Sequence, residues 1–202
     1  MRERQQAPAG GNVRDIRVMG DPVLRTPCDD VTDFDDDLRT LVDDMFTTMY
    51  AVRGVGLAAN QIGISQRIFV FDCPDDDQVR HTGVICNPVV ELPEGKDRHL
   101  ESLDEGCLSL PGAYIELARP DHAVCRGQDA EGNPVEVTGT GLLSRCLQHE
   151  TDHLNGVVFG DRLSGRARKK LYRLHDDRAE DYPDDWPVSP RLRDEDEDED
   201  GD

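Results

Sequence analysis

The sequence QHETDHLNG at residues 148–156 constrains the fold of this 202-residue chain more than any other stretch. Leucine and cysteine recur at three- and four-residue steps before it, which favours a helix. On a helix His149 and His153 lie one turn apart on the same face, where both imidazoles could bind one metal ion. Glu150 projects about 60° away from His153, close enough to contact a metal-bound water without being a ligand. The stretch therefore predicts a helix with two metal ligands and a general base.

This helix should be buried and should point its histidines inward. Leu142 and Cys146 share the face of the two histidines, and Gly156 lies where a left-handed turn would end the helix. A catalytic metal site usually has three protein ligands and an open position for water, so one more ligand must come from elsewhere. The same spacing also occurs by chance on solvated helices, so the motif alone leaves both interpretations open.

The chain is acidic, with 43 Asp and Glu against 23 Lys and Arg and a net charge of -20. Eight of the acidic residues lie in residues 194–202 and six in 176–185, so the remaining chain is less extreme. This balance argues against DNA or an anionic membrane as a general partner. No apolar run approaches the roughly 20 residues that span a bilayer, and residues 1–11 lack the apolar segment of a secretory signal. We expect a cytoplasmic protein whose six cysteines are reduced.

The remaining elements predict an α+β fold. Thr32 with Asp35 resembles a capping box, and the amphipathic pattern after it predicts a helix that ends near Gly54. Strands are expected in five stretches, the last two of which form an antiparallel hairpin. They are residues 15–24, where a turn follows the strand, 67–72, 84–90, 123–128 and 134–137.

Two glycine-rich segments remain, GVGLAANQIG at residues 54–63 and EGCLSLPG at 105–112. The small residues of the first let the backbone approach another group closely, although a tight connection between a helix and a strand would explain them equally well. In the second, the bend around Cys107 could present a thiolate, which makes this cysteine the best placed of the six. An inert core cysteine is the alternative.

Taken together and in this order, these three segments resemble the three signature motifs of peptide deformylases, and the resemblance covers roughly residues 13–165. It implies an α+β fold in which antiparallel sheets surround the buried metal-binding helix. It also implies that Cys107, His149 and His153 bind the metal and that Glu150 is the general acid and base.

The resemblance also implies the groups that hold the substrate. The side chain of Gln61 and the backbone N–H of Leu108 would bind the formyl oxygen, and Gly56 would lie beside the substrate. We add Val55, Leu142 and Arg145 to the expected substrate-binding residues. Relatives often carry an aliphatic residue at the position of Arg145, so its stem would have to cover apolar surface while its charged head reaches solvent.

The implied reaction releases formate from N-formylmethionyl peptides of newly made proteins. Fe²⁺ is the expected ion, with Zn²⁺ or Ni²⁺ as alternatives. Arg119 would pair with Glu105 and brace the cysteine bend. The basic residues 166–173 could bind the ribosome, although the acidic tail after them would repel rRNA.

The resemblance gives a catalytic domain at residues 13–174. The composition of the two ends predicts a disordered N-terminal extension at residues 1–12 and an acidic, disordered tail at 175–202. Two other functions stay open. A HExxH metallopeptidase would need a third His or Glu ligand downstream, where His175 is the only histidine. A non-catalytic metal-binding protein would need a fourth protein ligand, for which Cys146 is the candidate.

Overall fold

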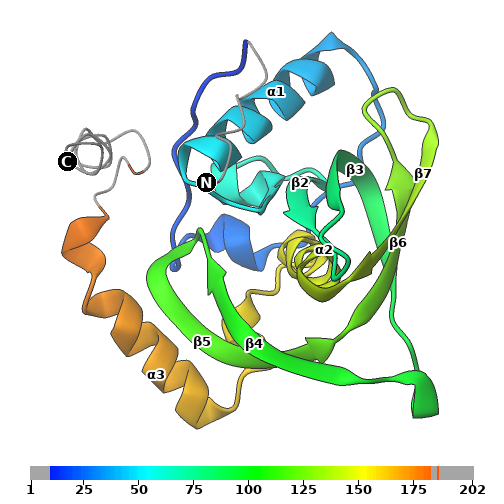
Figure 1. The fold of residues 1–202 in the computed structure, drawn as a ribbon. Coiled ribbons are helices and arrows are strands. Elements are labelled where there is room, and N and C mark those ends of the chain that lie inside the picture. The colour runs from blue at the N-terminus through cyan, green and yellow to red at the C-terminus, as the bar shows by residue number, and fades with distance from the viewer. Residues whose placement is uncertain (1–9, 183–185, 187–202) are drawn as a thin grey trace, which may run out of the picture.

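Helix α2 (Gly141–Leu154) lies at the centre of the molecule and strands surround it on several sides (Figure 1). The computed structural model describes residues 10–182 and residue 186. A five-stranded antiparallel sheet has the order β1 (Gly56–Ala58), β2 (Ile68–Pro74), β3 (Arg80–Glu91), β6 (His122–Gln128) and β7 (Pro134–Thr140). Strands β4 (Leu100–Cys107) and β5 (Leu110–Pro120) form a second antiparallel sheet. The predicted α+β architecture around a buried helix is confirmed.

Strand β2 begins with four apolar residues, 68–71, because helices cover both faces of the sheet there. Its side chains alternate between the faces. Ile68 and Val70 pack with helix α1 (Asp36–Ala51), whereas Phe69 and Phe71 pack with α2. The run of apolar residues in the sequence therefore indicates a strand that is buried on both faces.

Helix α1 begins at a different cap from the one expected. The side chain of Asp35, not Thr32, accepts the backbone N–H of Leu38, and Thr32 bonds to Asp33 instead. The helix ends at Ala51, three residues before Gly54. The apolar pattern located the body of the helix correctly. Which of the neighbouring residues caps it depends on the backbone conformation just before the first turn, where Asp35 is extended.

The strand expected within residues 15–24 is wrong. The described chain is irregular up to a short 3₁₀ helix at Pro22–Arg25. Its backbone bonds go to separated partners, with the amide of Arg17 bound to Gln61 O at 2.7 Å and that of Met19 to Ser109 O at 2.8 Å. These backbone amides thus anchor an irregular connecting segment against two distant parts of the chain and build no strand ladder.

Strands β4 and β5 were not expected from the sequence. They meet in a tight hairpin at Cys107 and Leu110, with a register shift next to Gly106. Helix α3 (Gly165–Asp176) packs along β5 and buries Leu171 (Figure 1). The remaining described elements are 3₁₀ helices at Ala59–Ile62, Gly95–Asp97, Phe159–Arg162 and Ala179–Asp181.

The predicted domain limits, after residue 12 and after residue 174, both lie close to the ends of the part of the chain that the structure describes. Residues 1–9 lie outside the described residues, while the backbone of Asn12 donates to Asp44 at 2.6 Å. The limit at residue 174 falls inside α3. Most of the expected disordered tail, including the acidic run at 194–202, lies outside the described residues. Among the described residues, no helix combines the length and the apolar character that a membrane span requires.

Candidate active site

Three donor atoms converge beside the centre of α2. Cys107 Sγ lies 3.2 Å from His153 Nε2, which lies 3.2 Å from His149 Nε2, and the three donors all fall within 4.8 Å of one another. Ligands at about 2.0 to 2.3 Å from one tetrahedral ion lie roughly 3.3 to 3.8 Å apart. Both 3.2 Å separations are close to that range, so the cluster fits a single metal ion.

The local sequence explains how these ligands meet. His149 and His153 are four residues apart on α2, and Gly156, at φ 72°, ends the helix where a side chain would collide with Arg25 O. Cys107 arrives from the β4–β5 hairpin. Burial lowers the pKa of His153 well below its usual value, so this ring is neutral, as a metal ligand must be.

Glu105 orients His149 from behind the site. Its Oε1 lies 2.7 Å from His149 Nδ1, which leaves Nε2 directed at the cluster. Burial alone would raise the pKa of Glu105, but the hydrogen bonds from Arg119 and His149 hold it well below its usual range. Burial likewise opposes protonation of His149, but in the metal-free protein the contacts with Cys107 and Glu105 raise its pKa well above the usual value, so binding of an ion would release a proton from this ring. Glu105 therefore remains an anion that pairs with His149.

The expected ion pair between Arg119 and Glu105 is present. Arg119 Nε and Nη2 donate to the two Glu105 oxygens at 2.8 and 2.7 Å, and Nη1 donates to Asp152 at 2.9 Å. Both residues of the pair are buried. Asp152, on α2, in turn accepts from Arg162. Arg119 thus ties the hairpin that carries the cysteine to the helix that carries the histidines.

Arg145 departs from the expectation in one respect. It lines the cleft, but its guanidinium is buried and does not reach solvent. Nη1 donates to Glu105 at 2.8 Å and to Leu117 O at 2.9 Å, and Nη2 donates to Glu101 O at 3.0 Å. The buried carboxylate of Glu105 attracts the charged head inward, a partner that a helical wheel does not reveal.

Glu150 is buried beside the cluster and faces a backbone with no side chain. One of its oxygens, Oε2, has no hydrogen-bond partner among the described residues. A Cβ at Gly56 would lie 2.4 Å from the other oxygen, so only glycine leaves room for this carboxylate. Burial raises the pKa of Glu150 to about 7. A carboxylate with a raised pKa can both accept and return a proton near neutral pH.

Gln61 is held so that its amide nitrogen faces the cluster. Its Oε1 accepts the Ala58 amide at 2.9 Å, which directs Nε2 to within 3.7 Å of Cys107 Sγ and 3.2 Å of Ser109 Oγ. Leu108 follows Cys107 at the hairpin turn and also lines the cleft. The side-chain amide of Gln61 and the residue after the cysteine thus both border the site.

A cleft of about 450 Å³ opens onto these groups. Val55 and Leu142 lie at its surface and are 40% and 37% exposed, so Leu142 is less buried than the helical pattern predicted. Every residue that we expected to bind substrate lines this cleft. They are Val55, Gly56, Gln61, Leu108, Leu142 and Arg145.

Neither the metallopeptidase nor the closed metal-binding site finds, among the described residues, the additional ligand that it would need. Among the described residues, the group of possible ligands contains Cys107, His149 and His153 and lacks Cys146. The Cys146 thiol donates to Val55 O at 3.5 Å instead. His175 Nδ1 lies 3.1 Å from Pro111 O, away from the cluster. The third ligand comes from upstream, as a cysteine, and residues 10–182 and 186 add no fourth protein ligand to this group.

Sequence reasoning missed four residues around the site. Ser109 accepts from Gln61, and Asn60 donates to His153 O at 2.6 Å. Both lie within the glycine-rich motifs, and their polarity in apolar surroundings was the available signal. Tyr182 and Trp186 also line the cleft, although the acidic composition around them had suggested a tail.

Comparisons with known proteins agree on one family. The family model described as polypeptide deformylase matches residues 13–169. Peptide deformylase 1 of Streptomyces avermitilis is 53% identical over 174 residues, which cover 86% of this chain and 80% of that protein. A crystal structure of a peptide deformylase from Legionella pneumophila has a TM-score of 0.74 at 42% identity and covers 83% and 96% of the two chains. A peptide deformylase from Synechococcus elongatus, crystallised with actinonin, has a TM-score of 0.73 at 38% identity and covers 86% and 91%.

Proposed function

This chain belongs to the peptide deformylase family and removes the N-formyl group from nascent peptides, and from that premise we propose how its residues perform the reaction. Cys107, His149 and His153 hold one divalent ion. The convergence of these three donors beside an open cleft is the observation that carries the proposal. Three protein ligands are typical of catalytic sites, where one position stays available to water or substrate.

We propose Fe²⁺ as the resident ion. One thiolate and two imidazoles also suit Zn²⁺ or Ni²⁺, so the donor set leaves these as alternatives. When bound, the ion supplies Lewis-acid activation of water and of the formyl carbonyl. To test this, the purified protein is loaded separately with each ion under argon, and formate release is measured before and after exposure to air. The iron-loaded protein is expected to lose activity in air.

Glu150 acts as general base and then as general acid. It takes the proton of the water that attacks the formyl carbon, and it returns that proton to the amine as the C–N bond breaks. Its buried position beside the ligands and its unpartnered oxygen support this role.

Gln61 and Leu108 stabilise the negative charge that develops on the formyl oxygen. The Gln61 side chain is held by its bond to the Ala58 amide, so its amide nitrogen needs little reorganisation as the charge forms. The Leu108 backbone N–H, at the hairpin turn after Cys107, is the second donor. Loss of one such donor typically lowers the rate about 10² to 10³-fold.

Substitution of Glu150 tests the assignment. Glu150→Ala should keep the metal, because none of the three ligands changes, and should lose about 10² to 10⁴-fold in kcat. Formate release from formyl-Met-Ala-Ser and metal content by mass spectrometry give the two readouts. Deformylation at the wild-type rate would reject Glu150 as the base.

We propose that Val55, Gly56, Leu142 and Arg145 contact the substrate, with methionine preferred as its first residue. The position of all four in the cleft supports this. Because the Arg145 head is bound to Glu105, only its stem is left to face an apolar side chain. Equal kcat/KM values for formyl-Met and formyl-Ala peptides would remove the methionine preference.

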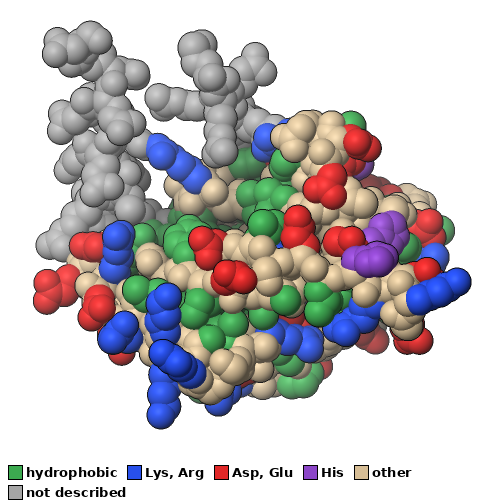
Figure 2. All heavy atoms as spheres, turned by 60° about the horizontal axis from the view of Figure 1, so that its bottom comes forward, with side chains coloured by type: hydrophobic (Ala, Val, Ile, Leu, Met, Phe, Trp, Pro, Cys, Tyr) green, Lys and Arg blue, Asp and Glu red, His purple; other side chains and the backbone are tan. Residues whose placement is uncertain are grey.

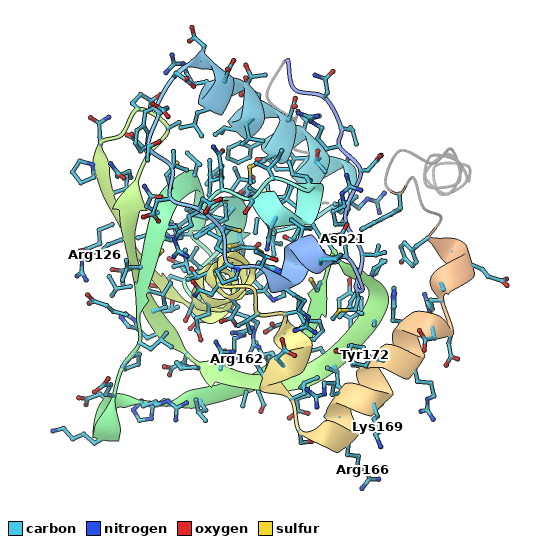
Figure 3. All side chains as sticks on the ribbon, turned by 180° about the vertical axis from the view of Figure 1, so that it is seen from behind. Asp21, Arg126, Arg162, Arg166, Lys169 and Tyr172 are labelled. Atoms are coloured by element: carbon cyan, nitrogen blue, oxygen red, sulfur yellow. The ribbon has the colours of Figure 1, made fainter. Side chains whose placement is uncertain are left out.

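The outer face of α3 is the proposed contact with the ribosome. The helix carries five Lys or Arg and one Asp. Arg166 and Lys169 point away from the body (Figure 3), on the side of the molecule where basic side chains gather (Figure 2). Sedimentation with ribosomes at increasing salt tests this proposal, since Arg166→Glu combined with Lys169→Glu should abolish the association. We also place the protein in the cytoplasm, where nascent chains are made, which six free cysteines support.

A further inference from the structure

Tyr182 and Trp186 line the same cleft as the metal ligands. Both residues follow helix α3, and both lie after the residues that the family model matches, 13–169. Part of the wall of the cleft is therefore built from residues that lie beyond the span of the family model.

The two rings are held in place by contacts with distant parts of the chain. The backbone amide of Ile16 donates to Trp186 O at 3.1 Å, and the rings of Tyr182 and Trp186 meet edge to face at 5.4 Å. Trp186 is 4% exposed and belongs to the core cluster that also contains Met49. Its position is thus fixed by the folded domain.

Tyr182 also lies against the start of strand β5, shortly after the metal-binding cysteine. A Cβ at Gly112 would lie 3.0 Å from Tyr182 Cε2, and Gly112 has a φ of +76°. The turn after Cys107 leads through Leu108 into the start of β5 at Gly112, so this stretch connects the position of the formyl group with the aromatic pair. A peptide whose formyl end lies at Cys107 can extend along this stretch toward the rings.

We propose that Tyr182 and Trp186 form an apolar wall that contacts the residues after the methionine of the formylated peptide and favours apolar side chains there. This inference rests on the cleft being the active site proposed above. Burial of two methylene groups against the rings would raise kcat/KM roughly tenfold relative to a substrate that lacks those residues. These residues would therefore act on substrate choice and leave the chemical step unchanged.

Two substrates separate this role from a structural one. Formyl-Met-Leu-Leu extends past methionine, whereas formyl-methionine amide does not. Trp186→Ala and Tyr182→Ala should each lower kcat/KM for the longer peptide about tenfold, through KM, and leave the amide within about twofold of wild type. Trp186→Phe should stay within about threefold on both, because it keeps a ring and the indole N–H has no acceptor among the described residues. Asp181→Ala, in the same segment but outside the cleft lining, is the matched control.

Equal losses on the two substrates would overturn the inference and assign the rings to stability alone. Unchanged kinetics in both alanine variants would overturn it as well. If Trp186→Ala fails to fold, Tyr182→Ala gives the same comparison, because Tyr182 is only partly buried. Absence of formate release from the wild-type protein would reject the proposed function itself, an outcome distinct from any pattern among the variants.

Discussion

Replacing Gly56 with alanine should displace the carboxylate of Glu150 and leave the metal ligands in place. The three atoms nearest the added Cβ belong to Glu150 and Cys146, at 2.4, 2.7 and 2.9 Å. A relaxed contact needs about 3.5 Å, so Glu150 Oε1 must retreat by roughly 1 Å. The backbone has little freedom to move instead, since Gly56 pairs with Phe71 in the sheet.

A displacement of this size has a large effect on rate and a small one on binding of the ion. Misplacement of a catalytic group by about 1 Å costs on the order of 10²-fold. We therefore expect Gly56→Ala to lower kcat for formyl-Met-Ala-Ser about 100-fold while the metal content stays at one ion per chain. The assay combines formate release, elemental analysis and thermal unfolding on the same preparation.

Gly54→Ala is the control for this experiment. Gly54 lines the same cleft, but its nearest neighbours would lie at 3.1 to 3.3 Å, and the closest is the mobile end of Leu108. This variant should keep kcat within about threefold of wild type. The reasoning fails if Gly56→Ala works as fast as Gly54→Ala, or if Gly56→Ala loses metal in parallel with activity.

Two further substitutions test the buried charges. Glu105→Gln removes the anion that Arg119 and Arg145 share, leaving Arg119 with Asp152 as its anionic partner, so it should lower the free energy of unfolding by about 3 to 5 kcal/mol in urea titrations. It should also weaken metal affinity about 10 to 100-fold in chelator competition, and wild-type affinity would contradict the role given to Glu105. For Asp72, burial alone would raise the pKa, but hydrogen bonds from Arg80 and neighbouring hydroxyl groups hold it below the usual value. The charged carboxylate therefore stabilises the folded state above about pH 4, and this stabilisation is lost as pH falls through the pKa of the folded state. The stability difference between wild type and Asp72→Asn should therefore shrink from pH 5 toward pH 2, whereas a constant difference would show that the charge of Asp72 is not what stabilises the fold.

The parts of the site that follow local rules were predicted from the sequence. His149 and His153 share a face because of the helical period, and the turn at Gly156 is a property of that one residue. The hairpin of β6 and β7 was recognisable for the same reason, since its turn and both strands lie within one short stretch. In each case the information needed is contained in neighbouring residues.

The parts that depend on distant residues were not predicted by such rules. Strand β4 is largely exposed and charged, and its pairing with β5 is stabilised by packing against α3, some fifty residues later in the sequence. Tyr182 and Trp186 were hidden by the charge of the residues around them. The pairing of Glu105 with Arg119 was expected only through the resemblance, because no local pattern brings the two together.

Arg145 shows most clearly what the sequence alone could not decide. On an isolated helix its charged head would have to reach solvent, because a lone buried guanidinium is prohibitively unfavourable. The anion of Glu105 changes this balance, since its two oxygens accept from Arg119, Arg145 and His149 at once. Such a buried cluster is weak evidence for stability, because desolvation offsets much of the attraction. Its clear effect is on geometry: Glu105 fixes the ring of His149, so the Nε2 donor is oriented toward the other two ligands in the protein itself, and binding of the ion requires little further ordering.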